Sequence, residues 1–294
     1  MTSDPVALKL TNLAKPFWPQ DGYTKGRLVA YYQEVAPHLL PHLRDRYLSL
    51  TRYPDGIHGK RFYQKNIPPS APAWIRRGPF RHGERTINYC LADSPATLVW
   101  LAQWGVIEIH PWLSRSDAPA FPDFAVFDLD PSPPAGFTES VEVAFMVRTI
   151  LGQLGLRAYP KTSGATGIHI YLPLCRGPSY STIARLVAGV ADIIHEACPG
   201  RTTRERVVAR RRGVYIDHLQ NAMGKTLAAP YCLRPLPGAP VSAPVAWDEL
   251  PRLKPGDLNL ESLGERLSRV GDLFRPVLED PQDVGNALRA LGIE

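Results

Sequence analysis

Two aspartates, Asp128 and Asp130, lie in the stretch Phe124-Ala-Val-Phe-Asp-Leu-Asp130, directly before the run Pro131-Ser-Pro-Pro134. Side chains alternate between the two faces of a strand, so both carboxylates would lie on one face, about 6–7 Å apart. Because prolines cannot donate to a sheet ladder, we expect the strand to end there and to present both acids at a rim. Such a pair is typical of an Mg²⁺ or Mn²⁺ site, and the alternative is a solvated Asp-Pro turn.

A third acid, Asp217, lies in Val214-Tyr-Ile-Asp-His218, where it shares a strand face with Tyr215. If this strand pairs with the first, three carboxylates converge and can hold two divalent ions about 3.5–4 Å apart. Two ions at that spacing clamp the attacking hydroxyl and the leaving oxygen of a phosphoryl displacement. The pairing itself does not follow from the sequence and is a hypothesis.

Three further segments could bind phosphate or nucleic acid. Thr162-Ser-Gly-Ala-Thr-Gly-Ile-His169 has two glycines whose backbone N–H groups could approach a phosphate, but it lacks the lysine of a Walker A loop and could be a plain connector. The arginine-rich run from Arg201 to Arg212 could track phosphates or be a solvated loop. Lys60-Arg-Phe-Tyr-Gln-Lys65 could stack unpaired bases, or be an ordinary strand with one aromatic in the core.

Hydrophobic periodicity predicts the elements that position these residues. Thr24 is a predicted N-cap, which places Lys25 in the first turn of a helix, where a cation is unfavourable unless an anion binds nearby. From residue 124 onward the pattern becomes strand, helix, strand. We predict strands over 47–52, 86–90, 106–110, 157–159, 168–172 and 214–219, helices near 96–104, from Thr138 to a C-terminal Gly155, and up to Pro199, and a helical tail with Leu263, Leu267, Val270 and Phe274.

Composition narrows the classes of protein. The 294 residues, 44% hydrophobic and 21% charged, indicate a soluble globular chain with room for a sizeable core. Lysine and arginine exceed aspartate and glutamate by 34 to 28, which permits a polyanionic partner. The four cysteines form no CxxC pair, so we expect buried free thiols and no zinc knuckle. No apolar run approaches a bilayer span and the N-terminus lacks a signal peptide's pattern, so we expect a cytoplasmic protein with no membrane partner.

Taken together, these residues resemble the polymerase domain of non-homologous end-joining DNA ligases of the ligase D type, within the archaeo-eukaryotic primase superfamily. The resemblance extends over nearly the whole chain. Asp128-Leu-Asp130-Pro resembles the family's first motif, Thr162-Ser-Gly to Ile168-His169 its second and Asp217 in Tyr215-Ile-Asp-His-Leu-Gln-Asn221 its third, with further matches at Leu10-Thr-Asn-Leu-Ala-Lys15, Tyr23-Thr-Lys25-Gly, Arg52-Tyr-Pro-Asp-Gly56, Ile107-Glu-Ile-His110 and Pro230-Tyr-Cys-Leu-Arg234. So many motifs in order make the match specific.

The resemblance implies a role for each motif. The catalytic, metal-binding residues would be Asp128, Asp130 and Asp217, with a two-metal site that takes Mn²⁺ or Mg²⁺. The incoming nucleoside triphosphate would be held by Ser163, His169 and Arg234, with His110 and Gln220 lining the same pocket. Lys15 and Lys25 would recognise the 5′-phosphate of a DNA gap or break, and the residues contacting DNA or template would be Arg52, Phe62, Tyr63, Lys65, Arg211 and Arg212.

One position departs from the family pattern. The second motif commonly has a lysine before its second glycine, where this chain has Thr166. The missing cation should weaken triphosphate binding, unless Lys161, Lys225 or the arginine-rich run replaces it.

The function that follows is a template-dependent, ribonucleotide-preferring nucleotidyltransferase that extends 3′ ends or fills short gaps during non-homologous end joining. Its partners would be 5′-phosphorylated DNA, nucleoside triphosphates, Ku and a DNA ligase, in a nucleoid-associated setting. The alternatives are a primase that starts strands de novo and a non-catalytic module that bridges DNA ends. The absence of a cysteine cluster argues against a zinc-bearing primase.

The expected fold is α/β (α+β), with a central mixed, largely antiparallel sheet flanked by helices. We expect a single primase-polymerase domain over residues 1–294. Its parts would be an N-terminal α/β portion over 1–117, a catalytic portion like an RNA-recognition motif over 118–235, and a helical C-terminal tail over 236–294.

Overall fold

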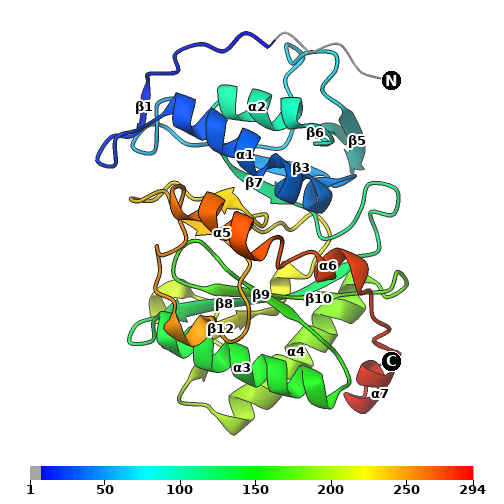
Figure 1. Cartoon of the computed structure of the whole chain (residues 1–294). Coiled ribbons are helices and arrows are strands. Elements are labelled where there is room, and N and C mark those ends of the chain that lie inside the picture. The colour runs from blue at the N-terminus through cyan, green and yellow to red at the C-terminus, as the bar shows by residue number, and fades with distance from the viewer. Residues whose placement is uncertain (1–7, 294) are drawn as a thin grey trace.

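Two helices and a sheet form the N-terminal part of the computed structural model, which describes residues 8–293 (Figure 1). The predicted helix cap is confirmed: the Thr24 hydroxyl accepts a hydrogen bond from Arg27 N at the start of α1 (Lys25–Leu43). With α2 (Pro95–Gln103), α1 covers one face of this sheet. The strands are β3 (Leu48–Arg52), β4 (Phe62–Gln64), β5 (Arg77–His82), β6 (Arg85–Cys90) and β7 (Val106–Pro111), in the order β4-β3-β6-β5 with β7 also paired to β3.

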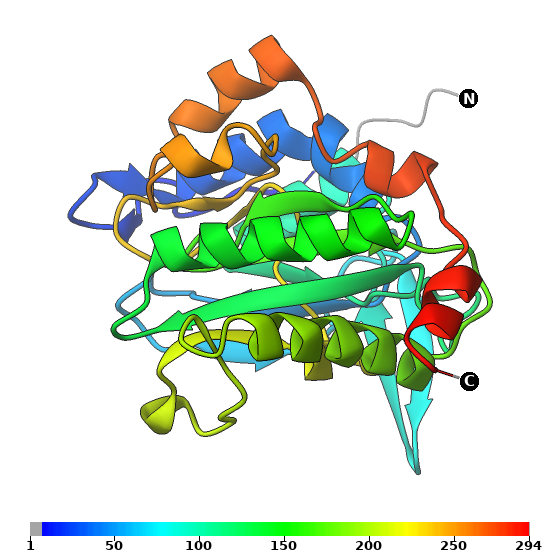
Figure 2. The same ribbon diagram turned by 90° about the horizontal axis from the view of Figure 1, so that it is seen from below.

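A second five-stranded sheet follows in the chain, in the order β11-β12-β8-β10-β9. Its strands are β8 (Phe124–Ser132), β9 (Tyr159–Thr162), β10 (Ile168–Pro173), β11 (Thr202–Thr203) and β12 (Gly213–Asp217). All pairs are antiparallel except β11 with β12, so the predicted mixed, largely antiparallel sheet is confirmed. Two helices, α3 (Phe137–Gln153) and α4 (Tyr180–Ala197), cover one of its faces (Figure 2).

Strand alternation in β8 separates the core from the acidic face. Ala125, Phe127 and Leu129 pack with α3 and α4 in one hydrophobic cluster. The intervening positions, which include Asp128 and Asp130, point to the other side of the sheet. The pattern that identified the acids in the sequence therefore also determines which face of the sheet they occupy.

The strand does not end at the acids, and that prediction was wrong. β8 stays paired with β12 as far as Ser132 opposite Gly213, whereas its pairing with β10 stops at Leu129 opposite Ile168. The Leu129 carbonyl points toward Gly167, because a Cβ placed on Gly167 would lie 2.3 Å from that oxygen. Pro131, two residues later, faces the same side, where the ladder has already ended. Its missing N–H therefore costs no hydrogen bond.

Two other strand boundaries differ from prediction. The strand predicted over 157–159 is β9, which begins at Tyr159 because its pairing with β10 runs from Tyr159 opposite Tyr171 to Thr162 opposite Ile168. β12 ends at Asp217, whose side chain accepts a hydrogen bond from Leu219 N and so starts a 3₁₀ turn. Both boundaries depend on a partner that is distant in the sequence or on a side chain that caps the backbone.

The C-terminal third of the chain returns to both sheets. Residues from Ala229 to Ala243 join the hydrophobic cluster of α1 and α2. The predicted tail helix is α5 (Ser262–Val270), and Phe274 lies beyond it. The remaining elements are β1 (Pro16–Trp18), β2 (Tyr23–Thr24), β13 (Cys232–Leu233), β14 (Val241–Ser242), α6 (Pro276–Glu279), α7 (Gly285–Ala290) and the 3₁₀ turns Val208–Arg210, His218–Gln220 and Leu250–Arg252.

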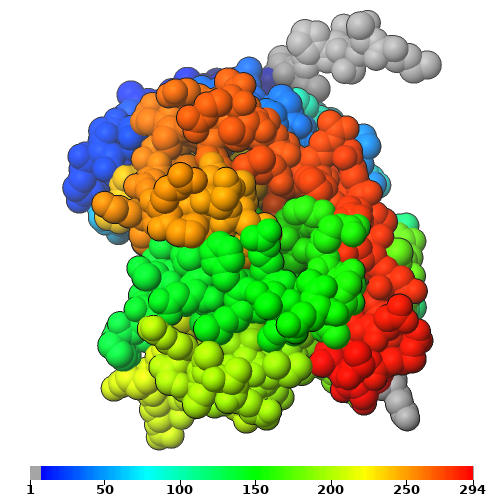
Figure 3. All heavy atoms as spheres, turned by 60° about the horizontal axis from the view of Figure 1, so that its bottom comes forward, coloured from blue at the N-terminus to red at the C-terminus, as the bar shows by residue number. Residues whose placement is uncertain are grey.

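The end of the chain closes one side of the helical layer. In Figure 3 the last described residues lie against α3 and α4. A Cβ added to Gly189 of α4 would lie 3.6 Å from Leu291 Cδ1, so the Leu291 side chain packs close to this helix. Of the four free cysteines, Cys90 and Cys232 are buried as expected, whereas Cys175 is exposed. No helix within residues 8–293 is long and apolar enough to cross a bilayer. The division at residue 118 stays a prediction.

Candidate active site

The hypothesis that the two acidic strands pair is confirmed. β12 lies beside β8 with Asp217 directly opposite Asp128 and Tyr215 opposite Asp130. Side chains directly opposite in an antiparallel pair have Cβ atoms about 4.5–5.5 Å apart. The three carboxylates therefore meet on one face of the sheet, with Asp128 buried and Asp130 about half exposed.

The acids repel one another. Burial, followed by the charges of Asp130 and Asp217, raises the pKa of Asp128 well above its ordinary range. Burial and Asp217 also raise the pKa of Asp130, although the Arg211 guanidinium opposes the shift. Arg211 Nη1 lies 3.5 Å from Asp130 Oδ2, and its guanidinium lies 3.9 Å above the Tyr215 ring. An arginine therefore lies where it offsets part of the acidic charge.

The three carboxylates supply oxygen ligands that suit a hard divalent cation. In this structure, however, Asp130 and Asp217 interact with other partners. Within residues 8–293, no three Asp, Glu, His or Cys side chains are already arranged around one metal position. Asp217 Oδ1 accepts a hydrogen bond of 2.9 Å from Leu219 N, and Asp130 faces Arg211. Carboxylate oxygens are the ligands that Mg²⁺ and Mn²⁺ prefer, and a bound cation would offset the repulsion around Asp128. The assignment of these acids as metal ligands stays a prediction.

His169 joins the acidic face from the other neighbouring strand. It lies opposite Asp128 in the β8–β10 register, with its Nε2 atom 3.3 Å from Asp128 Oδ1. Burial and the charges of Lys161 and Arg234 hold the pKa of His169 well below its usual value. A neutral imidazole is therefore expected there at neutral pH.

Lys161 orients that imidazole from behind. Its side chain is fully buried, and its Nζ atom is 2.8 Å from His169 Nδ1 and hydrogen-bonded to the Ser242 hydroxyl. Burial, then the charge of Arg234, lowers the pKa of Lys161 to about 7. Because Lys161 is enclosed, it is not a free cation that could replace the lysine missing at Thr166.

A cavity of about 630 Å³ is lined by three of the predicted nucleotide-binding residues, whereas Ser163, Thr166 and His169 do not line it. His110 comes from β7 of the first sheet, Gln220 from the 3₁₀ turn after β12, and Arg234 from the segment after β13. Lys225 lines the same cavity, as do Arg61, Tyr63, Lys65, Thr51, Glu108 and Met223. Lys225 is therefore the candidate replacement cation that the fold places in the cavity.

Glu108, which the sequence interpretation did not select, fixes Arg234. Arg234 Nε donates to Glu108 Oε1 at 2.8 Å, and a second guanidinium nitrogen donates to the Ser163 carbonyl. Burial would raise the pKa of Glu108, but the hydrogen bond and charge of His110, together with Arg234, lower it to about 2. Glu108 shares a strand face with His110, and that two-residue spacing was the available signal.

The loop after β9 differs from an open phosphate cradle. The Ser163 hydroxyl accepts hydrogen bonds from Ala165 N and Gly167 N, so two of the loop's donors are already engaged. Gly164 has φ +74°, and a Cβ there would lie 2.6 Å from Arg234 Cγ, so glycine is required where the loop meets that arginine. Thr166 is exposed. The structure thus brings Ser163 to Arg234 but leaves Thr166 at the surface.

The residues predicted to contact template divide into two groups. Phe62 and Tyr63 are both exposed, so the alternative of one aromatic in the core was wrong. They point to opposite faces of β4, and only Tyr63, with Lys65, lines the large cavity. Arg52 instead packs its guanidinium 3.8 Å above Trp104 and donates to that residue's carbonyl. Arg212 is exposed and lines neither the large cavity nor the acidic face.

Lys15 and Lys25 lie together at the start of α1. Lys25 is buried, its Nζ atom donates to Thr11 O at 3.1 Å, and burial followed by the charge of Lys15 lowers its pKa. Lys15 Nζ pairs with Asp55 at 2.5 Å. The first helical N–H groups already donate to the Lys15 and Leu13 carbonyls. An anion here would therefore depend on the two lysine side chains.

Comparison with known proteins agrees with this geometry. Residues 24–274 match the model of the family described as LigD, primase-polymerase domain. The chain is 33% identical over 276 residues to the multifunctional non-homologous end joining protein LigD of Mycolicibacterium smegmatis, covering 93% of this chain and 36% of that protein. It is 32% identical to the bifunctional LigD of Bacillus subtilis, covering 96% of this chain and 46% of that protein. The chain thus spans less than half the length of these relatives.

A solved structure has the same fold. The polymerase domain from Mycobacterium tuberculosis Ligase D, in complex with DNA, superposes with a TM-score of 0.87 at 33% identity, covering 94% of this chain and 99% of that one. This agreement extends the α/β assignment to nearly the whole chain.

Proposed function

The chain belongs to the LigD primase-polymerase domain family, whose members are metal-dependent nucleotidyltransferases, and from this premise we propose that it extends DNA 3′ ends at 5′-phosphorylated gaps or breaks. The observation that supports this reaction best is Asp217 facing Asp128 across two paired strands. The same region has a cationic cavity large enough for a nucleotide.

Asp128, Asp130 and Asp217 are the proposed ligands of two Mn²⁺ or Mg²⁺ ions. Bound there, such ions would favour deprotonation of the attacking 3′-hydroxyl and offset the charge that develops as pyrophosphate leaves. The protein's own part is to hold the carboxylates in register through the β8–β12 ladder. Arg211, which now faces Asp130, would have to share or yield that oxygen when a cation binds.

The triphosphate would lie in the large cavity, against Arg234, Lys225, His110 and Gln220. Arg234 is pre-organised because Glu108 and the Ser163 carbonyl already hold its guanidinium. A planar, bidentate guanidinium is well suited to phosphate oxygens. Lys225 would supply the second cation that Thr166 cannot. A preference for ribonucleotides belongs to the same proposal.

DNA would bind on both sides of this centre. Lys15 and Lys25 would take the 5′-phosphate of the downstream strand, and Tyr63 and Lys65 would contact the template where β4 borders the cavity. Because the relatives are end-joining proteins, Ku and a DNA ligase are the proposed partners. Action in the cytoplasm, at the nucleoid, completes the proposal.

The decisive experiment replaces Asp128 by asparagine, which has nearly the same shape and no charge. We expect extension of gapped DNA to fall at least about a thousandfold, since a reaction of this kind depends on charge stabilisation at one site. Binding to the same 5′-phosphorylated DNA should stay within about twofold. Asp117→Asn, an exposed aspartate paired with Arg176, is the matched control and should extend normally. Undiminished extension by Asp128→Asn would refute the proposal.

A further inference from the structure

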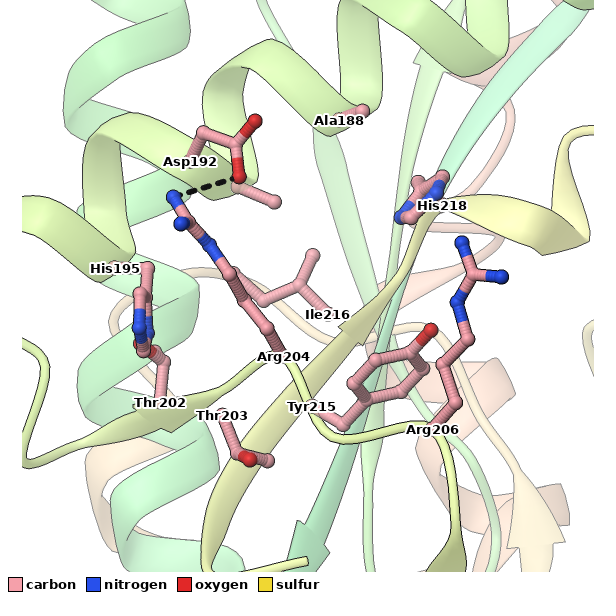
Figure 4. A pocket seen from close by; sticks show the side chains of 11 residues that line it. Ala188, Asp192, His195, Thr202, Thr203, Arg204, Arg206, Tyr215, Ile216 and His218 are labelled. Carbon is pink, nitrogen blue, oxygen red and sulfur yellow. Dashed lines mark hydrogen bonds and ion pairs between the residues drawn. The ribbon is translucent and has the colours of Figure 1, made fainter.

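A second cavity, of about 270 Å³, opens between the edge of the second sheet and α4 (Figure 4). It exists because β11 is two residues long and pairs only with Val214 and Tyr215 of β12. Beyond Tyr215, β12 has no neighbour on its outer side. The chain turns away there into the arginine-rich loop, and α4 forms the opposite wall of the cavity.

The charged groups in this cavity differ in whether they have partners. Arg204 is paired with Asp192 at 2.8 Å, and His195 Nδ1 is 2.8 Å from the Thr202 hydroxyl. In contrast, no hydrogen bond or ion pair joins the Arg206 guanidinium to another described side chain. With Asp192 neutralised, Arg206 gives the cavity a net positive charge.

Three groups able to donate hydrogen bonds gather on one side of this cavity. Arg206, the Tyr215 hydroxyl and His218 all line the cavity and lie together in Figure 4. Tyr215 is opposite Asp130 in the ladder, and His218 directly follows Asp217. A ligand in this cavity would therefore lie next to the proposed metal site.

The ligand is better suited to be a phosphate than a base. A base would need an open aromatic face on which to stack, but the Arg211 guanidinium already covers the Tyr215 ring at 3.9 Å. A guanidinium, a phenol hydroxyl and an imidazole are instead three hydrogen-bond donors suited to phosphate oxygens.

The geometry of the reaction indicates which strand supplies that phosphate. In phosphoryl transfer the attacking and leaving oxygens lie roughly in line, on opposite sides of the transferred phosphorus. The large cavity proposed for the triphosphate shares no lining residue with this cavity, and His218 and Gln220, which belong to the same 3₁₀ turn after Asp217, line different ones. With the leaving pyrophosphate assigned to the large cavity, the attacking 3′-hydroxyl and the strand that carries it are assigned to the other side of that turn, where this cavity opens.

We propose that the cavity lined by Arg206, Tyr215 and His218 binds a backbone phosphate of the upstream strand, close to the 3′ end that is extended. The inference rests on the proposed function, because it presumes a strand whose 3′-hydroxyl is the attacking group. It adds a second DNA phosphate site. This site would bind the upstream strand near its 3′ end, whereas Lys15 and Lys25 would bind the 5′-phosphate of the downstream strand.

The test measures binding rather than extension. Two DNAs are compared by fluorescence anisotropy: a template with only a 5′-phosphorylated downstream strand, and the same template with an added upstream strand ending in a dideoxynucleotide. The ratio of the two Kd values is the contribution of the upstream strand. Arg206→Gln should reduce that contribution about tenfold, the usual value of one charge-assisted contact, and should lower the salt dependence by about one counterion.

Arg210→Gln is the matched control, because Arg210 is an exposed cation of the same loop that does not line the cavity. It should keep the contribution of the upstream strand. A single methylphosphonate, placed in turn at the three linkages nearest the 3′ end, should weaken wild-type binding at one linkage and have no further effect there on Arg206→Gln.

The outcomes are distinguishable from failure of the proposed function. If the wild-type protein does not extend the same gapped DNA with a normal 3′ end, the proposed function is wrong. If it does extend, but Arg206→Gln retains the upstream contribution or loses no more of it than Arg210→Gln, the phosphate site is refuted. Absence of any upstream contribution in the wild type would refute it as well.

Discussion

The acidic face of the second sheet and the Glu108–Arg234 pair each contain a buried carboxylate, but they are built in opposite ways. Burial, and then the like charges of two neighbouring carboxylates, raise the pKa of Asp128. Glu108 has Arg234 and His110, which lower its pKa to about 2 against the effect of burial. The first cluster therefore needs an additional cation, whereas the second is already complete.

The difference assigns distinct tasks to the two clusters. A group of unneutralised carboxylates favours binding of a divalent ion, because binding relieves their repulsion. A satisfied ion pair holds a guanidinium in one position and so prepares it for phosphate. The contrast can be tested by removing charge from each cluster in turn.

The largest expected effect on stability comes from Arg234→Met. It leaves Glu108 buried without its arginine, and breaking a buried pair in this way typically costs about 3 kcal/mol of the free energy of unfolding. Urea denaturation measures the loss. Arg176→Met, which breaks the exposed pair with Asp117, should cost no more than about 1 kcal/mol. Equal losses in both variants would mean that the Glu108 pair is not a structural element.

Bound Mn²⁺ should stabilise the protein through the carboxylates of the acidic face and not through the Glu108–Arg234 pair. At a concentration about a hundredfold above its Kd, Mn²⁺ should stabilise the wild type by about 2.7 kcal/mol and raise Tm by about 5 °C. Asp217→Asn should lose most of that shift, since it removes one ligand. Glu108→Gln should keep it, and a shift lost equally in both variants would remove the distinction between the clusters.

The pH dependence of stability should reveal the contribution of the ionised Glu108 carboxylate to the free energy of unfolding. The folded-state pKa of Glu108 is about 2, below its unfolded value of 4.5, so its stabilising contribution is complete above pH about 4.5 and is lost as pH falls toward 2. The stability difference between the wild type and Glu108→Gln should therefore be constant from pH 7 to 5 and shrink below about 4.5. Urea titrations at pH 7, 5 and 4 test this, and a difference that grows on acidification would contradict it.

The smallest effect is expected from Thr166→Lys, which introduces a cation at an exposed position. If Arg234 and Lys225 already hold the triphosphate, KM for the nucleotide should fall only about threefold, with kcat and stability nearly unchanged. Thr166→Gln, similar in length but uncharged, is the control. A tenfold or larger fall in KM would show that the cavity alone holds the nucleotide poorly.

Much of the local architecture could be predicted from the sequence. The Thr24 cap, the α1 start and the position of Asp128 and Asp130 on one strand face all depend on neighbouring residues. Such features are determined within one turn of helix or a few strand positions, where periodicity and capping are sufficient. The ordered motifs in the sequence also indicated the family.

Only the tertiary structure brought the distant residues together. It placed Asp217 opposite Asp128, enclosed Lys161 behind His169 and paired Glu108 with Arg234, which lie 126 positions apart in the chain. Register between strands, burial of a lysine and the partner of a carboxylate depend on long-range packing, which no local pattern determines. The residue types thus determined which chemistry was available to this chain, and the fold decided which side chains could perform it together.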